Sequence, residues 1–383
     1  MPWKIAVAPN AFKGTLTASE AARYIERGLK RALPRVRIIK IPVADGGEGT
    51  AAAIVEATRG RWVRCSVRDP LGRRLRATFG LAGNGRTAVI EMAAASGLAL
   101  LKPHELDPLR ASTFGTGQLI RAALDRQVRE ILVGIGGSAT NDGGAGMARA
   151  LGVRFLDAQG RELSEGGGSL PKLARIDLRR LDLRLRQVEV TVACDVDNPL
   201  CGPRGAARVY GPQKGATPAM VKTLDTGLKR LAAVIKRDLG VEVAHLPGAG
   251  AAGGLGAGLV AFLHARMRSG VGIVIDAIDL RRKLQDCDLV ITGEGRLDGQ
   301  TAFGKAPAGV ARTAKSLGLP VIAICGSLGA DAAKVRSAGI DACFSALEEL
   351  IPAADLSRRA PGMLERCAEQ VGRILATLSL DKV

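Results

Sequence analysis

The chain has 383 residues, of which 47% are apolar and 24% charged, and this composition excludes a disordered chain, a coiled coil or a collagen-like fibre. Lys and Arg number 55 against 37 Asp and Glu, so the formal net charge of +18 favours anionic partners. Aromatic residues make up only 3% of the chain, too few for the stacking surfaces of proteins that bind single-stranded nucleic acid. We therefore expect small anions, and no nucleic acid, as partners.

The cysteines and histidines bear on the cell compartment and on metal binding. The seven cysteines form no CxxC pair, which is typical of reduced thiols in a cytosol. None of His104, His245 and His264 has metal spacing to a cysteine, which argues against a zinc site. The N-terminus lacks the apolar core of a signal peptide, and the uncharged stretch 246–263 is too short and too rich in glycine for a membrane span. We expect a cytoplasmic protein without a membrane partner.

The first fifty residues predict a β-α-β unit. Residues 4–8 form a short apolar strand, and Thr17 with Glu20 forms a capping box that opens a helix. Pro34 ends this helix, and residues 37–43 form the second strand. A strand, a helix and a strand in this order predict a parallel pair with a right-handed crossover.

The pattern changes near residue 60. Three β segments at 62–67, 75–81 and 87–92 are separated by turn signals at 69–72 and 83–85, which predicts a meander and the start of a second domain. Beyond these segments, helices and strands alternate again. The predicted elements are helices at 116–126, 143–151, 306–317 and 361–378, and strands at 130–135, 188–194, 288–292, 320–325 and 341–345.

These elements predict a fold of two α/β domains. A flavodoxin-like parallel-sheet domain would be built from both chain ends, residues 1–50 plus 285–383. A second, mixed α/β domain would be inserted at residues 51–284. We expect the active-site cleft between the two.

Four glycine-rich turns follow predicted strands or precede predicted helices: 44–50, 134–146, 248–254 and 292–299. Glycine lets a backbone approach a ligand closely, and amides at the start of a helix point towards anions. Ligands in open α/β sheets lie beyond the carboxyl ends of strands. Taken together, the four turns indicate phosphate binding rather than a purely structural role as tight turns.

Two of these turns come close to known nucleotide-binding fingerprints. Gly248–Gly253 satisfies GxGxxG after a possible strand at 241–246, and Asp276 could contact a ribose, so a dinucleotide-dependent oxidoreductase is an alternative. Pro247, between the strand and the turn, weakens this interpretation.

The second near-match, GxxxxGK at 299–305, is followed by Ala306 where a P-loop has the hydroxyl residue that binds Mg²⁺. We do not expect a P-loop there, although Lys305 could still meet a phosphate.

Carboxylates occur after a predicted strand and within the glycine-rich turns, where they could transfer a proton or bind a metal ion. Asp195 and Asp197 come directly after the strand at 188–194, and Asp45, Asp142 and Asp298 lie within glycine turns. In phosphoryl transfer one carboxylate accepts the proton of the substrate hydroxyl while another holds Mg²⁺.

Several motifs, taken in order, resemble the class I glycerate kinases of bacteria. They are Phe12–Ala18, Pro42–Thr50, Glu91–Gly97, Gly115–Gly117, Ile135–Gly144, Cys194–Gly202, Tyr210–Gly215, Pro247–Gly254, Thr292–Asp298 and Gly304–Pro307. The resemblance covers nearly the whole chain. It implies the two-domain fold described above, ATP and Mg²⁺ as cofactors, and D-glycerate as the substrate.

The resemblance also implies direct in-line phosphorylation of the 2-hydroxyl to give 2-phosphoglycerate, with 3-phosphoglycerate as the alternative product. Lys13, Asp45 and Asp195 are the expected catalytic residues, Asp195 being the base. The expected substrate- and phosphate-binding residues are Gly46, Gly47, Glu48, Gly136, Gly137, Ser138, Asn141, Asp142, Gly293, Glu294, Asp298 and Lys305. Asp45, Asp195 and Asp197 are the expected Mg²⁺ ligands.

The chain departs from the family pattern at one place. Where the family usually has Asp-Ser before Phe-Lys-Gly, this chain has Asn10-Ala11, so a carboxylate and a hydroxyl are missing. Asn10 can still form hydrogen bonds, so this change is compatible with activity.

We expect a monomer or a homodimer.

Overall fold

The computed structural model describes residues 2–47, 49–302, 305–349 and 351–379. The chain forms two compact units, unit 1 from residues 1–45 and 271–383, and unit 2 from residues 46–270. The sequence had placed the boundaries after residues 50 and 284. The structure divides the chain earlier at both places, because α2 (Thr50–Thr58) packs on strands of unit 2 and α10 (Leu280–Leu284) packs on α12 of unit 1.

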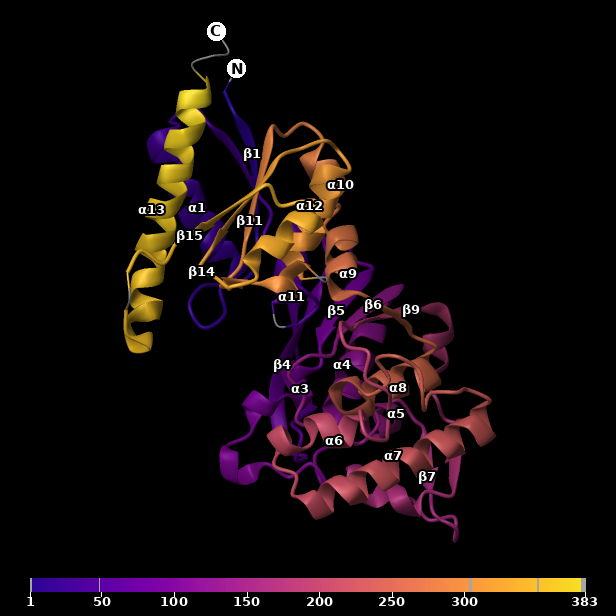
Figure 1. Ribbon diagram of the computed structural model, residues 1–383. Helices are drawn as coiled ribbons and strands as arrows, with labels where there is room; N and C mark the ends of the chain where they lie inside the picture. Colours follow the sequence, from indigo (N-terminus) through magenta and orange to yellow (C-terminus); the bar gives the residue numbers. More distant parts are fainter. Residues whose placement is uncertain (1, 48, 303–304, 350, 380–383) are drawn as a thin grey trace. The chain divides into compact units, whose positions relative to one another are not determined.

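Unit 1 contains a parallel sheet of five strands in the order β15-β13-β11-β1-β2 (Figure 1). The strands are β1 (Lys4–Pro9), β2 (Arg37–Lys40), β11 (Leu289–Gly293), β13 (Val321–Cys325) and β15 (Ala342–Ser345). Numbered within the unit, this is the strand order 2-1-3-4-5 of flavodoxin-like folds. The prediction of a flavodoxin-like sheet from both chain ends is confirmed.

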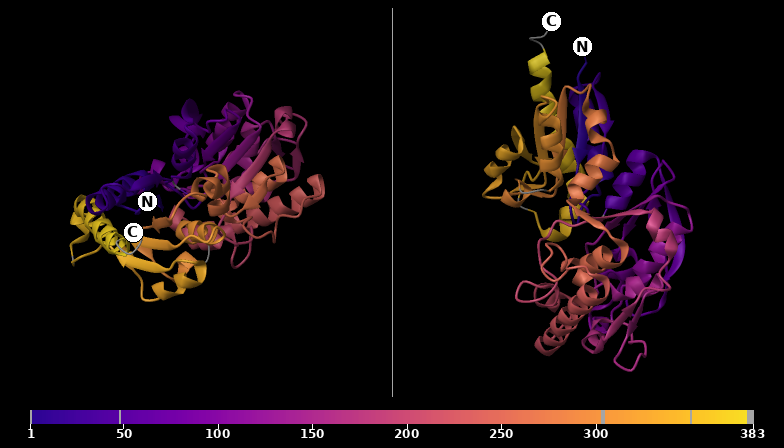
Figure 2. Two further views of the ribbon diagram at one scale, coloured as in Figure 1. Left: turned by 90° about the horizontal axis from the view of Figure 1, so that it is seen from above. Right: turned by 90° about the vertical axis from the view of Figure 1, so that its right-hand side faces the viewer.

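Helices cover both faces of this sheet. Helices α1 (Ala18–Ala32) and α13 (Ala353–Ser379) lie side by side on one face, and α12 (Ala306–Lys315) covers the other (Figures 1 and 2). The remaining helices of the unit are α9 (Gly270–Ala277), α10 and α11 (Gly299–Ala302), with a 3₁₀ turn at Ala332–Ala338 and a short parallel pair, β12 (Arg296–Leu297) and β14 (Ser327–Leu328).

The predicted capping box is present at the start of α1. The Thr17 hydroxyl accepts from the Glu20 amide, and the Thr17 amide donates to the Glu20 carboxylate. Further along α1, a Cβ on Gly28 would lie 2.1 Å from the Glu365 carbonyl oxygen, so only glycine allows α1 and α13 to approach this closely.

Helix α13 begins at Ala353, eight residues before the predicted start at 361. Pro361 had indicated the first helical turn, where proline is common, but it lies inside the helix. The helix continues through it because one apolar stripe, which includes Leu356 and Leu364, lies on the same face on both sides of the proline.

Unit 2 contains a mixed sheet of six strands in the order β10-β9-β6-β5-β4-β3. The strands are β3 (Arg61–Arg68), β4 (Arg74–Leu81), β5 (Thr87–Glu91), β6 (Glu130–Gly134), β9 (Glu189–Ala193) and β10 (Arg266–Arg268). The first three are antiparallel neighbours, as the predicted meander requires, and the other pairs are parallel. Asp69 shapes the β3–β4 turn by accepting from the amides of Leu71 and Arg73.

The other elements of unit 2 surround this sheet. Its helices are α2, α3 (Ala93–Ser96), α4 (Phe114–Leu124), α5 (Ala145–Ala150), α6 (Ala206–Tyr210), α7 (Pro218–Leu239) and α8 (Ala251–Leu263). Its 3₁₀ turns are Leu98–Leu100, Pro103–Glu105, Gly167–Lys172, Leu183–Gln187 and Pro212–Lys214, and β7 (Arg154–Leu156) pairs with β8 (Arg175–Asp177). The long helix α7 was not predicted.

The GxGxxG turn is part of the packing of unit 2. Residues 241–246 do not form the predicted strand. A Cβ on Gly250 would lie 2.3 Å from the Pro199 carbonyl oxygen, and one on Gly253 would lie 2.0 Å from that of Thr140. These glycines allow backbone to pack against backbone, and without the preceding strand the turn lacks the structural context that a dinucleotide fingerprint requires.

Among the described residues, no helix has both the length and the apolar character needed to span a membrane.

Candidate active site

A cavity of about 380 Å³ lies at the carboxyl edge of the unit 1 sheet. Its walls come from the segments that follow all five strands and from the first turns of α13. The lining residues are Ala11, Phe12, Lys13, Thr15, Asp45, Glu294, Gly295, Arg296, Asp298, Lys305, Gly326, Ser327, Ala346, Leu347, Leu356, Ala360, Met363 and Leu364. Open α/β sheets bind their ligands at this edge, and the volume is in the usual range for small-molecule sites.

Cations and carboxylates converge in one part of this cavity. The Nζ atom of Lys305 lies 3.8 Å from Asp298 Oδ1, and Arg296 Nε lies 3.9 Å from Asp298 Oδ2. Lys13 and Asp45 line the same cavity from the loops that follow β1 and β2. The structure therefore brings together five predicted site residues of unit 1: Lys13, Asp45, Glu294, Asp298 and Lys305.

Glu294 differs from the other carboxylates because it is buried. Its Oε1 accepts a hydrogen bond of 2.7 Å from the Thr301 hydroxyl. Burial raises the pKa of Glu294, and the nearby Asp45 and Asp298 raise it further, against the opposing effects of Thr301 and Lys305. A carboxyl in this setting binds a proton more readily, and the protonated form can donate to a phosphate oxygen.

Gly293, the residue before Glu294, is required by packing. A Cβ there would lie 1.8 Å from the Ile324 carbonyl oxygen of the neighbouring strand. Its own carbonyl accepts from the Asn10 amide, which joins the ends of β11 and β1. The Asn10 side chain is nearly buried, and its Oδ1 accepts from the amide of Ala11, so it holds the turn that leads into the cavity wall.

Glycine loops gather at the carboxyl edge of the unit 2 sheet. Gly136 and Gly137 follow β6 and are exposed, and a Cβ on Gly136 would lie 3.5 Å from Gly47 Cα. A Cβ on Gly46 would lie 2.5 Å from Gly270 Cα, so Gly46 must be glycine for this approach. The predicted residue Glu48 lies outside the described residues.

Asp195 and Asp197 follow β9 at the same edge. Asp195 is exposed, and its Oδ1 accepts from the Gly270 amide at 2.9 Å. Asp197 forms an exposed ion pair of 2.9 Å with Arg204. No group of three or more His, Cys, Asp or Glu side chains with metal-binding geometry occurs among the described residues.

A buried lysine lies behind the glycine loop of unit 2. Lys214 is 1% exposed, and its Nζ donates to the Ser138 hydroxyl at 2.7 Å and to the Thr140 carbonyl at 2.6 Å. Burial lowers the pKa of Lys214 to about 7, although the charge of Asp142 opposes this shift. Lys214 therefore fixes Ser138 and Thr140 and titrates near neutral pH.

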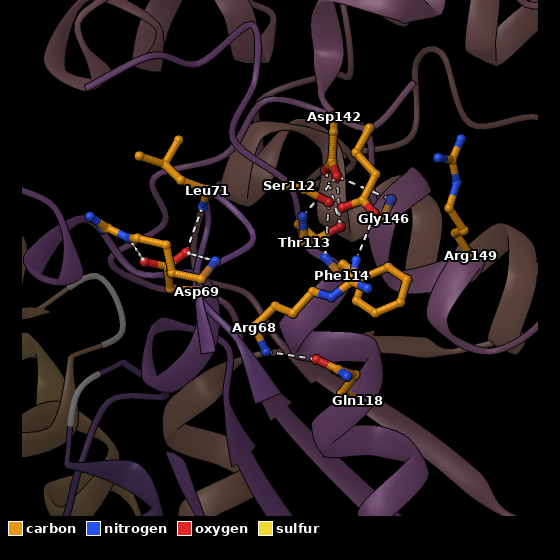
Figure 3. Close-up of polar contacts among 12 residues, drawn as sticks. Arg68, Asp69, Leu71, Ser112, Thr113, Phe114, Gln118, Asp142, Gly146 and Arg149 are labelled. Carbon is orange, nitrogen blue, oxygen red and sulfur yellow. Dashed lines mark hydrogen bonds and ion pairs between the residues drawn. The ribbon is translucent and has the colours of Figure 1, made fainter. Parts of the chain in front are cut away.

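Asp142 holds the other end of this loop (Figure 3). Its carboxylate accepts from the amide and the hydroxyl of Thr113 and from the amides of Gly144 and Gly146. Burial raises the pKa of Asp142, and these four hydrogen bonds oppose the shift. Donors from the unit occupy both oxygens, so contact between Asp142 and a phosphate stays a prediction that this arrangement does not favour.

The side chain of Asn141 differs from that of Asp142 in its hydrogen bonding. Asn141 is fully buried, and neither its Nδ2 nor its Oδ1 has a hydrogen-bond partner among the described residues. A buried polar group without a partner costs roughly 1–3 kcal/mol, so such groups are often found at functional sites. Its predicted part in substrate binding remains a prediction.

A cavity at the carboxyl edge of a doubly wound sheet, with cations converging in one part, is typical of enzymes that bind phosphorylated small molecules. Comparison with known families narrows this class. The model of the glycerate kinase family matches residues 5–376, and the chain belongs to this family. The family prediction is confirmed.

Known relatives are similar over almost their whole length. The chain is 52% identical to a glycerate kinase of Halalkalibacterium halodurans over 96% of this chain and 97% of the relative. It is 49% identical to a glycerate 2-kinase of Escherichia coli K12 over 97% of this chain and 98% of the relative. A crystal structure from Salmonella typhimurium LT2, described as a glycerate kinase 2, matches all of both chains with a TM-score of 0.90 and 50% identity.

Sequence reasoning did not identify Lys214 or Thr113 as site residues. Locally, Lys214 looks like an ordinary lysine of a turn, and only the fold shows that it is buried. The available signal was the pair of glycines around it. A Cβ on Gly211 would lie 2.2 Å from the Ala207 carbonyl oxygen, and Gly215 has a φ of +89°.

Lys214 should make stability depend on pH. Its pKa is about 7 in the folded state and near 10.5 when unfolded, so between these values the unfolded chain binds more protons. The unfolding free energy of the wild type, relative to that of Lys214→Met, should therefore rise above pH 7 by up to about 1.4 kcal/mol per pH unit. Urea denaturation between pH 6 and 9 measures this difference.

Lys229→Met is the matched control, because Lys229 is exposed and its ion pair with Asp225 raises its pKa. The difference in unfolding free energy between Lys229→Met and the wild type should not change between pH 6 and 9. An equally flat difference for Lys214→Met would contradict the lowered pKa.

Proposed function

We propose that this glycerate kinase family member transfers the γ-phosphoryl group of ATP to the 2-hydroxyl of D-glycerate and forms 2-phosphoglycerate. The unit 1 cavity carries the proposal, because its lysines and Arg296 offer the charge that a polyphosphate needs. The relatives support the same reaction, since one of them is a glycerate 2-kinase. Phosphorylation of the 3-hydroxyl is the alternative outcome.

The proposed transfer is direct and in line. The Asp195 carboxylate accepts the proton of the glycerate hydroxyl, whose oxygen attacks the γ-phosphorus while the bond to ADP breaks. The exposed position of Asp195 after β9 supports this role. Lys13 stabilises the charge on the transferring group and reaches it from the loop after β1.

Backbone amides supply the rest of the anion binding in this proposal. Gly136 and Gly137 present exposed backbone after β6, and the buried Lys214 and Asp142 hold the part of the loop that follows them through hydrogen bonds. Loops fixed before the substrate arrives need no reorganisation in the transition state. Gly46 and Gly47 would contribute in the same way.

Mg²⁺ fits the oxygen donors that this chain offers. It prefers one or two carboxylates, with phosphate oxygens and waters as the other ligands. One or two of Asp45, Asp195 and Asp197 would hold it, together with phosphate oxygens and waters. When bound, it would neutralise charge on the β- and γ-phosphates. A cytoplasmic location and a monomeric or homodimeric state are also part of the proposal.

The first test is turnover. ADP formation from Mg²⁺-ATP should require D-glycerate, and omission of glycerate should abolish it. The same assay with L-glycerate shows whether the pocket distinguishes the enantiomers. Folded protein that forms no glycerate-dependent ADP with either enantiomer would contradict the proposal.

Asp195→Asn should lower kcat by at least ~10²-fold, because the amide cannot accept the hydroxyl proton. Asp125→Asn is the matched control, since Asp125 is an exposed surface acid of the same unit, paired with Arg184. Near-normal turnover of folded Asp195→Asn would remove Asp195 from the role of base.

A further inference from the structure

The cavity of unit 1 has a second, apolar part. Helix α13 contributes Leu356, Ala360, Met363 and Leu364, which lie at i, i+4, i+7 and i+8 and therefore on one face. The segment after β15 and the loop after β1 complete this part with Ala346, Leu347 and Phe12. The charged side chains described above line the same cavity, so one cavity offers two different chemistries.

The apolar face of α13 changes its partner along the helix. Farther along, Ala368, Val371 and Leu375 are buried in the core that also contains Ile25 and Leu29 of α1. In the first turns Leu356 and Ala360 are only partly buried and line the cavity. The stripe therefore begins as a cavity wall and ends as core.

This wall is held in place. The Ser357 hydroxyl donates to the Gly14 carbonyl at 2.9 Å, which ties the start of α13 to the loop that carries Lys13. Farther along, the ion pair between Arg31 and Glu365 joins α13 to α1. The apolar wall and the lysine loop thus have a fixed relation within unit 1.

The two chemistries restrict the ligand. Glycerate has a carboxylate and two hydroxyls on three carbons and no apolar face, so it gains nothing from this wall. A nucleoside triphosphate has a flat, largely apolar base at one end and a polyanion at the other. Burial of the base against such side chains is favourable, because it removes apolar surface from water.

Given the proposed function, we propose that the nucleotide binds in this cavity, its base against Leu356, Ala360, Met363 and Leu347 and its phosphates towards Lys13, Lys305 and Arg296. Unit 1 is thereby the nucleotide-binding unit. The cavity volume of about 380 Å³ is in the range of small-molecule sites.

Filling the apolar part tests this assignment. Ala360→Leu should raise the KM for ATP by at least ~10-fold, because the larger side chain occupies the place of the base. The KM for D-glycerate and kcat at saturating ATP should stay near the wild-type values. In calorimetry the variant should bind ATP more weakly but inorganic tripolyphosphate as the wild type does, because tripolyphosphate needs only the cations.

Ala354→Leu is the matched control, since Ala354 is exposed on the same helix and does not line the cavity. Leu347→Asn is the second variant, because Leu347 is 37% exposed and its replacement should leave the fold intact. It should weaken ATP binding by roughly threefold or more through loss of apolar contact.

Unchanged ATP affinity in both folded variants would overturn the base site. An equal loss of ATP and tripolyphosphate affinity would also overturn it, because the apolar wall would then act only through the shape of the phosphate site. Weakened ATP binding in a protein that never phosphorylates glycerate would keep the base site and contradict the proposed function instead.

Discussion

The candidate site depends on one constraint, the parallel direction of all five strands in unit 1. Parallel strands place their carboxyl ends at one edge, so residues far apart in the sequence meet there. Lys13 follows the first strand, Glu294 the third and Leu347 the fifth, and all three line one cavity. The close packing of α1 and α13 at Gly28 completes the arrangement, because it fixes the helix that forms the apolar wall.

The candidate site residues of unit 2 depend on buried charged groups. Lys214 and Asp142 lie inside the unit, where an unpaired charge would be costly, and each is held by hydrogen bonds to the loop after β6 or to the helices beside it. Their hydrogen bonds hold the residues that directly follow the exposed Gly136 and Gly137. This is the condition under which backbone amides stabilise an anion without reorganisation.

Much of this could be predicted from the sequence. Strand periodicity, the alternation of strands and helices and the Thr17 capping box can be recognised locally, so the flavodoxin-like class of unit 1 and the meander of unit 2 were accessible. The GxGxxG turn left a dinucleotide site open as an alternative, because glycines that bind a ligand and glycines that pack backbone on backbone have the same sequence pattern. The burial of Lys214 and the apolar wall at Ala360 depend on contacts distant in sequence, which local patterns do not contain.

The central claim is the reaction itself, and phosphorus NMR of the product tests it most directly. The protein would be incubated with Mg²⁺-ATP and D-glycerate, and the coupling of the new phosphorus signal to the glycerate protons would identify the carbon that carries the phosphate. We predict a phosphomonoester on C2 together with stoichiometric ADP. A phosphate on C3, or no phosphorylated glycerate from folded protein, would contradict the account.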